Sequence, residues 1–289
     1  MRLGLVTPVV TLLPKAHARW EREAGWEDVV AIARAADRLG YDHLTCSEHV
    51  AVPTGIAAAR GGRYFDPLAT LGYLAADTER IRLATYVLVL GYHHPLEVAK
   101  RYGTLDVVSG GRVVLGVGVG SLEEEFDLLG ASFADRGERA DESLAAIRAA
   151  WGRAEPSFAG EHVAYDGVVV DPPAPRAEVP IWVGGRTERS LRRALALGDG
   201  WAPFAVEPPE VAALLDRHDA LGRDGFDVVL QPVPPLDPIE RAEESADHLG
   251  RLADAGATIV GVRVMHHSRA HYVEQLEAAM ALPGVEPLR

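Results

Sequence analysis

The sequence of 289 residues contains a single cysteine, Cys46. One thiol cannot form an intrachain disulfide and is too few for a cysteine metal cluster, so a disulfide-stapled secreted domain is excluded. A basic excess is also lacking, because 29 lysines and arginines face 42 acidic residues and the net charge is −13 at pH 7. We therefore expect neither a nucleic acid nor a membrane surface as a partner, since both are anionic.

Long hydrophobic runs are missing as well. Beyond the N-terminus the longest apolar run, Leu83–Tyr92, is far shorter than the ~20 residues that a membrane-spanning helix needs. Residues 1–18 have some features of a signal peptide, but Pro8 and Pro14 interrupt their apolar stretch. We therefore predict a buried first strand, Arg2–Val6, and a cytoplasmic protein.

What the chain does contain is a regular alternation of short apolar segments with amphipathic ones. The apolar segments predict strands at Arg2–Val6, His43–Cys46, Ile81–Leu90, Arg112–Val119, Ile181–Gly184, Gly200–Ala205, Val228–Val233 and Ile259–Val264. Apolar residues at helical spacing predict helices at Trp26–Leu39, Leu144–Trp151, Leu191–Leu197, Val211–Leu221, Ala242–Ala255 and Tyr272–Leu282. Two more helices are predicted to begin at Asp66-Pro67 and His94-Pro95, where proline occupies the first helical position.

Eight strands alternating with eight helices predict one (β/α)8 barrel, a TIM barrel, as a single domain over residues 1–289. The surplus length falls in a loop at residues 47–65, after the second strand, and in an insertion after the fourth strand and its helix. This insertion, residues 154–180, is predicted to hold a hairpin that pairs Phe158–Val163 with Gly167–Asp171. A doubly wound Rossmann sheet is the alternative, although no glycine fingerprint follows the first strand.

Active sites of such barrels lie at the carboxyl ends of the strands. The fifth strand ends in Gly184-Gly185-Arg186-Thr187, directly before a predicted helix. Helix N–H groups with a guanidinium and a hydroxyl form a pocket for phosphate, and the alternative is a plain turn with a solvated arginine. Gly118, in the glycine cluster that ends the fourth strand, predicts either a flat ring against the backbone or tight packing in the barrel.

Glu48 and His49 follow the second strand and are candidates for acid–base catalysis near neutral pH, with an incidental loop histidine as the alternative. Cys46 is predicted to be a buried small residue, not a nucleophile. His43, His49 and His93 suggest a metal-dependent hydrolase, but no His-x-His ends the first strand. We therefore expect no metal site.

Together these motifs resemble the luciferase-like monooxygenase superfamily and, within it, the deazaflavin (coenzyme F420) dependent oxidoreductases of actinobacteria. The resemblance covers nearly the whole chain. The segments that show this resemblance are Ser47-Glu48-His49, Ile81–Gly120, Glu124-Glu125-Phe126, Phe133–Glu142, Pro180–Gly185 and Gly198–Trp201.

The resemblance implies that the cofactor ring lies at the barrel mouth, against a bulge in the third strand at Tyr86-Val87. Family members often have a non-proline cis peptide at this bulge. The resemblance also assigns the acid–base role to His49. The family's phosphate contacts map to Gly185, Arg186 and Thr187.

The implied function is hydride transfer between coenzyme F420 and a small organic substrate. Deazaflavin members commonly carry aspartate before the histidine, whereas Glu48 here is typical of flavin-using relatives. An FMN-dependent monooxygenase with a partner reductase is therefore the alternative, followed by a metal-dependent hydrolase and a non-catalytic deazaflavin carrier. The substrate is expected to contact loops that contain Tyr64, Tyr92 and His93, and the family suggests a homodimer.

Overall fold

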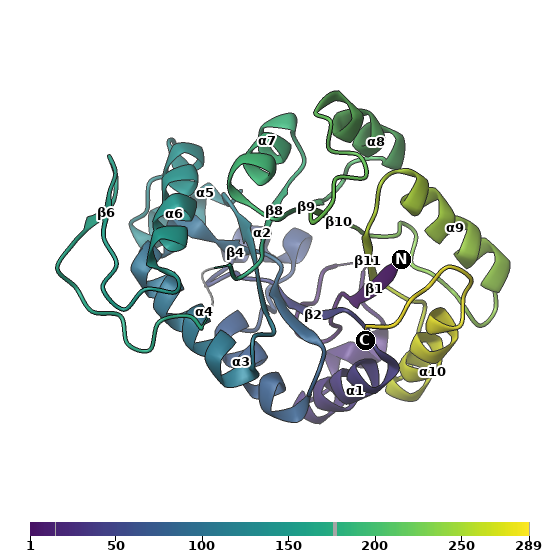
Figure 1. Ribbon diagram of the computed structural model, residues 1–289. Helices are drawn as coiled ribbons and strands as arrows, with labels where there is room; N and C mark the ends of the chain where they lie inside the picture. Colours follow the sequence, from purple (N-terminus) through teal and green to yellow (C-terminus); the bar gives the residue numbers. More distant parts are fainter. Residues whose placement is uncertain (15, 176–177, 289) are drawn as a thin grey trace.

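Eight parallel strands close into a barrel in the computed structural model, which describes residues 1–14, 16–175 and 178–288 (Figure 1). In order around the barrel they are β1 (Arg2–Leu5), β2 (His43–Cys46), β3 (Arg82–Thr85), β5 (Val113–Gly118), β8 (Ile181–Gly185), β9 (Gly200–Pro203), β10 (Asp227–Leu230) and β11 (Ile259–Val262). Pairing of β11 with β1 and of β3 with β5 completes the ring. The predicted TIM barrel is confirmed.

Helices surround this barrel. They are α1 (Trp26–Leu39), α3 (Pro67–Asp77), α4 (Pro95–Ser109), α6 (Arg136–Ala150), α7 (Glu188–Leu197), α8 (Pro208–Arg217), α9 (Ala242–Asp254) and α10 (Arg269–Met280). The loops after β2 and β5 add the short helices α2 (Thr54–Arg60) and α5 (Glu123–Leu129), and 3-10 turns form η1 (Arg19–Arg22) and η2 (Leu90–Tyr92). Among the described helices, none combines the length and apolar character needed to cross a membrane.

Most predicted strands and helices of the barrel differ from the observed ones by no more than four residues at either end, and two differ by more. The third strand is not continuous over Ile81–Leu90, because it breaks after β3 and resumes as β4 (Leu88–Val89), which pairs with β5. The peptide bond between Tyr86 and Val87, within this break, is cis, as predicted. Helix α6 begins eight residues before the predicted start at Leu144, because its polar first turns show no apolar periodicity.

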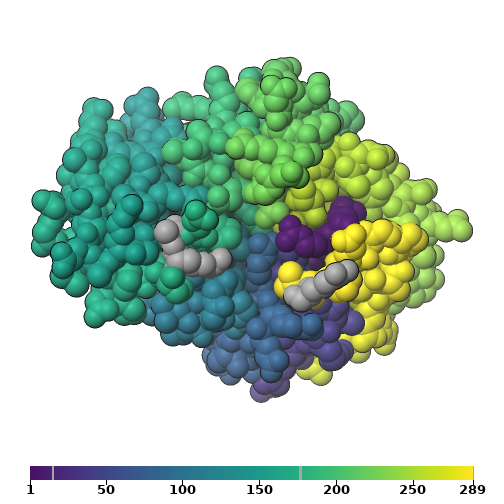
Figure 2. All heavy atoms as spheres, viewed as in Figure 1, coloured from purple at the N-terminus to yellow at the C-terminus, as the bar shows by residue number. Residues whose placement is uncertain are grey.

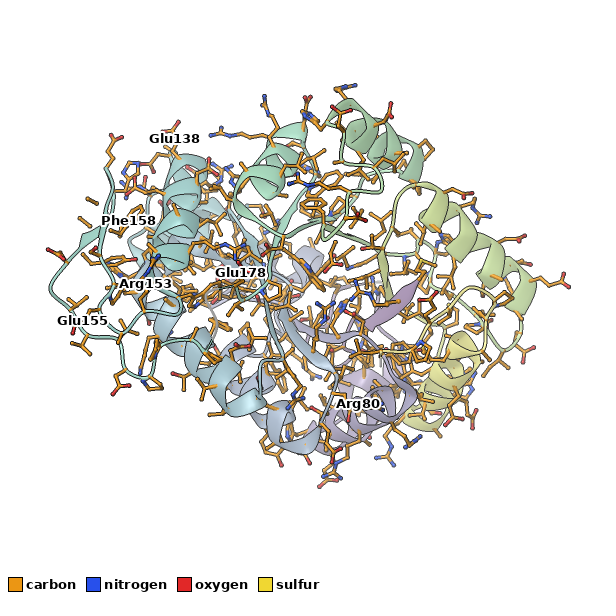
Figure 3. The ribbon with its side chains drawn as sticks, viewed as in Figure 1. Arg80, Glu138, Arg153, Glu155, Phe158 and Glu178 are labelled. Carbon is orange, nitrogen blue, oxygen red and sulfur yellow. The ribbon has the colours of Figure 1, made fainter. Side chains whose placement is uncertain are left out.

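The predicted hairpin of the insertion is wrong in its register. The strands are β6 (Phe158–Ala159) and β7 (Ala164–Tyr165), so the turn lies between them and precedes Asp166-Gly167, near which the predicted pairing places it. Glu142 of α6 fixes this turn, because its carboxylate accepts three successive backbone N–H groups at 2.6 to 2.9 Å, from Glu161, His162 and Val163. Figure 3 labels Phe158 in this insertion, at one edge of the molecule. Positions 176 and 177 of the insertion lie outside the described residues.

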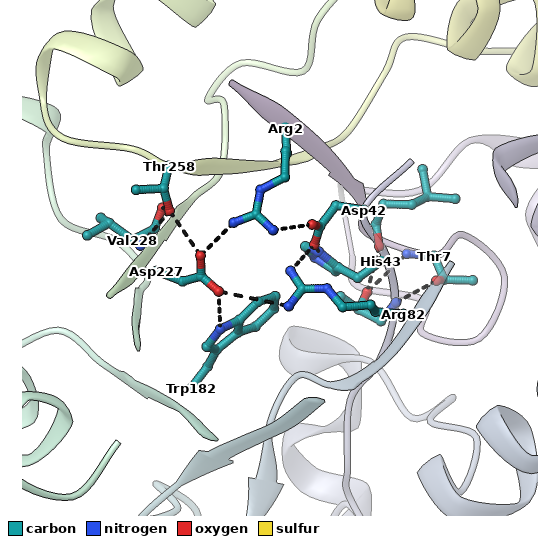
Figure 4. A network of polar contacts seen from close by, with 11 residues as sticks. Arg2, Thr7, Asp42, His43, Arg82, Trp182, Asp227, Val228 and Thr258 are labelled. Carbon is teal, nitrogen blue, oxygen red and sulfur yellow. Dashed lines mark hydrogen bonds and ion pairs between the residues drawn. The ribbon is translucent and has the colours of Figure 1, made fainter. Parts of the chain in front are cut away.

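The amino-terminal end of the barrel holds a network of charged side chains (Figure 4). Arg2 donates to Asp42 at 2.8 Å and to Asp227 at 2.7 Å. Arg82 contacts both carboxylates, and His43 Nδ1 donates to Asp42 at 2.8 Å. Burial opposes the ionisation of Asp42, but the hydrogen bond from His43 and the nearby arginines hold its pKa well below its usual range. These contacts join the starts of several strands.

The two chain ends also meet. The amino group of Met1 donates to the carbonyl oxygen of Gly284 at 2.9 Å, and the N–H of Glu286 donates to Met1 at 3.0 Å. Figure 2 shows the first and last segments side by side on one face. The last residues therefore hold the start of β1 in place.

Candidate active site

A cavity of about 690 Å³ opens at the carboxyl end of the barrel. This volume lies within the range of about 300–1,000 Å³ that is usual for cofactor and substrate sites. The structure places all catalytic and cofactor-binding candidates from the sequence on its wall: Glu48, His49, Tyr86, Val87, Gly118, Gly184, Gly185, Arg186 and Thr187. Of the residues expected to contact substrate, Tyr64 and Tyr92 also line it, whereas His93 lines a separate cavity. Four strand ends that are far apart in the sequence thus meet around one space.

The bulge between β3 and β4 is bonded to the end of β2. Ser47 Oγ donates to the carbonyl oxygen of Tyr86 at 2.7 Å. The N–H of Glu48 donates to the carbonyl oxygen of Val87 at 3.3 Å. The bulge and the β2 end therefore form one wall of the cavity, and His49 follows directly after it.

Two glycines on this wall make room for the side chain of the bulge. A Cβ atom at Gly118 would lie 2.6 Å from Val87 Cγ2, and one at Gly184 would lie 2.9 Å from Val87 Cγ1. Of the two interpretations that the sequence left open for Gly118, this geometry favours tight packing. The glycines position Val87, and Val87 lines the cavity.

His49 is held by a buried carboxylate from another strand end. Its Nδ1 lies 2.6 Å from Oε2 of Glu125, a fully buried residue of α5. Glu125 also accepts the N–H groups of Val50 and Ala51, at 2.6 and 3.0 Å, and the hydroxyl of Tyr92 at 2.8 Å. Burial opposes its ionisation, but these donors, the His49 bond foremost, lower the pKa of Glu125.

This contact determines which nitrogen of the imidazole can act. An ionised carboxylate only accepts hydrogen bonds, so Nδ1 of His49 carries the proton that binds Glu125. Nε2 of the neutral ring is then the atom with a free lone pair. The ring of Tyr64 packs edge-on against His49, with centroids 4.5 Å apart, and restricts the imidazole further.

Glu48 does not take the place beside His49 that its sequence position suggested. Its carboxylate accepts the N–H of Val89 at 2.7 Å and contacts Nε2 of His93 at 2.7 Å. Glu125 was missed as the partner of His49, because the sequence shows three alike glutamates in a row. Only its place directly before the buried Phe126 distinguishes it from its two exposed neighbours.

The end of β8 and the start of α7 form a second wall. Thr187 caps α7 by accepting the N–H of Ser190 at 3.4 Å. Gly185 has φ +142°, and a Cβ there would lie 2.5 Å from Ser190 Cβ, so the turn requires glycine. Arg186, between them, is exposed. The wall therefore combines a helix N-terminus, a hydroxyl and a guanidinium.

Further arginines gather at the same side of the cavity. Arg136 stacks on the ring of Phe133 at 3.7 Å and donates to the carbonyl oxygen of Gly120 at 3.2 Å. Arg189 and Arg193 also line the cavity, although the guanidinium of Arg193 is paired with Asp141. Because the whole chain carries a charge of −13, this local positive rim indicates an anionic ligand.

The opposite wall carries a buried carboxylate and a histidine. Glu21 accepts the N–H groups of Val9 at 3.0 Å and Ala18 at 2.7 Å, which anchors the loop after β1. Trp20 donates from Nε1 to Nδ1 of His266 at 2.9 Å. Burial, with neighbouring histidines and an arginine, lowers the pKa of His266 to about 4. His266 is thus neutral near pH 7.

The geometry supports neither a cysteine nucleophile nor a metal site among the described residues. Burial raises the pKa of the Cys46 thiol to about 12, which leaves no thiolate to act as a nucleophile. Within residues 1–14, 16–175 and 178–288, no group of three or more histidine, cysteine or acidic side chains is arranged to hold a metal ion.

Comparisons with known proteins give the same family as the motifs. A family described as luciferase-like monooxygenase matches residues 1–282. An uncharacterised protein of Mycobacterium tuberculosis is 34% identical over 274 residues, which cover 87% of this chain and 93% of the relative. An F420-dependent glucose-6-phosphate dehydrogenase of Microbacterium testaceum is 32% identical over 209 residues, 67% of this chain and 59% of that protein.

Solved structures show the same fold. An F420-dependent secondary alcohol dehydrogenase in complex with an F420-acetone adduct aligns with a TM-score of 0.73 at 16% identity, over 96% of this chain and 98% of that one. Monooxygenase RslO1 from Streptomyces bottropensis aligns with a TM-score of 0.71 at 20% identity, over 98% of both chains. The resemblance read from the motifs is confirmed, and the chain belongs to the luciferase-like monooxygenase family.

Proposed function

We propose that the protein is an oxidoreductase that moves a hydride between coenzyme F420 and a small organic substrate, with His49 as the acid–base group. The observation that carries this proposal is the bond between His49 Nδ1 and the buried Glu125. It leaves Nε2 as the proton-exchanging atom, in a ring that lines the cavity beside the Tyr86-Val87 bulge.

The residues present fit an anionic ring cofactor. The β8–α7 wall, with Gly185, Arg186 and Thr187, suits a phosphate, and the bulge offers the ring a surface at Val87. When bound there, the deazaflavin supplies a carbon that donates or accepts a hydride. The F420-dependent relative and structural neighbour support this choice of cofactor.

His49 supplies the proton. When an alcohol is oxidised, Nε2 accepts the hydroxyl proton as the hydride leaves the adjacent carbon. In the reverse direction the protonated ring donates that proton to the carbonyl oxygen. Glu125 stabilises the imidazolium that forms, because its carboxylate lies 2.6 Å from Nδ1.

An FMN-dependent monooxygenase that uses oxygen and a partner reductase is the second candidate. The observation that favours it is Glu48, at the position where the resemblance to deazaflavin members leads us to expect aspartate. The alignment with monooxygenase RslO1 is equally compatible with this candidate.

The test is anaerobic mixing of protein loaded with reduced F420 and a panel of small ketones, imines and activated alkenes. We expect oxidised cofactor to appear with at least one substrate, and the reaction to be lost in His49→Ala. Absence of oxidation with every compound, together with oxygenation of a substrate by protein supplied with reduced FMN and oxygen, would instead establish the monooxygenase.

We further propose that the chain acts as a single domain and as a cytoplasmic homodimer, as the family resemblance suggests. Light scattering of the purified protein tests the dimer directly. A mass of twice 31.0 kDa is expected, and a mass of 31.0 kDa would contradict it.

A further inference from the structure

A second cavity, of about 230 Å³, lies between the barrel and helices α3 and α4. It reaches the surface, because the exposed residues Asp66 and Arg101 are among those that line it. Glu48 lines this outer cavity and also the cavity at the barrel mouth. One carboxylate therefore borders both spaces.

His93 connects this carboxylate to the outer cavity. Its Nε2 lies 2.7 Å from Glu48 Oε1, and its ring lines the outer cavity but not the mouth. The second carboxylate oxygen of Glu48 accepts the N–H of Val89 at 2.7 Å. Glu48 and His93 thus form a continuous polar bridge through the barrel wall, separate from the His49–Glu125 pair.

Charged groups around the bridge favour a proton on His93. Burial favours the neutral imidazole, but the hydrogen bond and charge of Glu48, together with Glu97 of α4, raise the pKa of His93. Arg101 of α4 acts in the opposite sense. The remaining titratable groups that face the bridge are Asp66 before α3, Tyr102 of α4, Tyr92 of η2 and Cys46 of β2.

We propose that Glu48 and His93 form a proton route between the outer cavity and the barrel mouth. The proposal rests on the proposed function, since only a reaction that consumes or releases a proton needs such a route. When cofactor and substrate fill the mouth, they separate His49 from bulk water. The bridge then supplies a proton to the mouth from the other side of the wall, where Glu48 borders the same cavity as His49.

The transfer involves protons alone. For each proton delivered, His93 accepts one from solvent at Nδ1 and gives one from Nε2 to Glu48. Glu48 then passes a proton to an acceptor in the mouth and is again a carboxylate. Tautomerisation of the neutral ring by proton exchange with solvent, from Nδ1–H to Nε2–H, restores the starting state of His93, and no other bond changes.

The test compares His93→Ala and His93→Gln in the F420-loaded enzyme. Glutamine keeps a hydrogen-bond donor for Glu48 but cannot relay a proton, so it separates transport from positioning. We expect both variants to slow hydride transfer by about tenfold or more at low buffer concentration, with unchanged cofactor affinity. Added imidazole, which can replace the ring that the alanine variant lacks, should restore the alanine variant only. The control His248→Gln makes the same substitution on α9, lines neither cavity and should behave as wild type.

Different results would contradict the proton route and the proposed function. A glutamine variant with wild-type rate, or an alanine variant that imidazole does not restore, would overturn the proton route and leave the proposed function intact. A wild-type protein that binds F420 but transfers no hydride to any substrate would overturn both, and this is seen before any variant is compared.

Discussion

The two ends of the barrel carry buried charges in opposite arrangements. At the amino-terminal end, Asp42 accepts from Arg2, Arg82 and His43, and all of these partners belong to the chain itself. At the mouth, His49 is bonded on one nitrogen only, and arginines such as Arg186 stand around open space. The first arrangement pairs its carboxylates with cations of the chain itself, and the two nitrogens that it leaves unbonded, His43 Nε2 and Arg82 Nε, are buried. The second leaves groups that face a cavity and can contact a ligand.

This difference separates stability from function. Buried charges that are mutually paired become costly when one partner is removed, because the other remains buried without compensation. Groups that point into a cavity contribute little to folding, and their loss is felt in binding or turnover. Variants at the two ends should therefore change different measurements.

The largest expected effect is at the mouth. His49→Ala should lower turnover by about 10²- to 10⁴-fold, the usual contribution of a positioned acid or base. Cofactor affinity should stay within about threefold of wild type, or about 0.7 kcal/mol. The unfolding free energy should fall by less than on breaking the Asp42 network, because Glu125 keeps its bonds from Val50, Ala51 and Tyr92. Cofactor absorbance with an active substrate gives the first quantity, and a binding titration and urea unfolding give the others. Normal turnover would move the acid–base role to Tyr64, Tyr92 or His93.

The matching change at the amino-terminal end of the barrel, which we call the closed end, is Asp42→Asn. It removes the charge but keeps the shape, and should lower the unfolding free energy by about 3–5 kcal/mol, the cost of breaking a buried pair. Turnover per folded molecule should not change. The exposed Asp247→Asn is the control, expected within about 0.5 kcal/mol of wild type. A stable but inactive Asp42 variant would contradict the division between the two ends.

A smaller effect is expected at the positive rim. Arg186→Ala should weaken cofactor binding by about 1.5–3 kcal/mol, the range for a hydrogen bond to a charged group. A cofactor fragment without phosphate should lose less affinity than the whole cofactor. Arg192→Ala, at an exposed arginine of the α7 helix that follows and outside the cavity wall, is the control. Equal losses for fragment and cofactor would show that Arg186 does not contact the anion.

The smallest effect is the acid dependence of the closed end. The pKa of Asp42 is lower in the folded state, so its contribution is complete above the unfolded pKa of about 3.9 and is lost as the pH falls towards the folded value. The stability difference between wild type and Asp42→Asn should be constant above about pH 5 and shrink by up to about 1.4 kcal/mol per pH unit below about pH 4. Urea unfolding across this range measures it. A difference that stays constant down to pH 3 would assign the stabilisation to another group.

The fold was predictable because its information is local and repeated. Apolar residues at strand and helix spacing recur along the chain, and Pro67 and Pro95 mark two helix starts. The hairpin was misplaced because its turn depends on Glu142, about 20 residues away in the sequence. Asp166-Gly167 is a good turn signal, but three hydrogen bonds to one carboxylate select a different turn.

The site was predictable only in part, for a similar reason. The position of His49 follows from the end of β2, and its place on the cavity wall agrees with this. Its partner does not follow, because Glu125 lies 76 positions away, on a helix of seven residues. Such a short helix shows no periodicity that would indicate which glutamate faces inward. Adjacency in sequence favoured Glu48, whose side chain instead contacts His93.

The central claim is that the open end of the barrel holds a deazaflavin. The most direct measurement is a titration of the purified protein with F420 and with FMN, followed by the absorbance and fluorescence of each ring. The account predicts saturable binding of F420, tighter than that of FMN and weakened by Arg186→Ala. Saturable binding of FMN alone, or binding of neither cofactor, would contradict it.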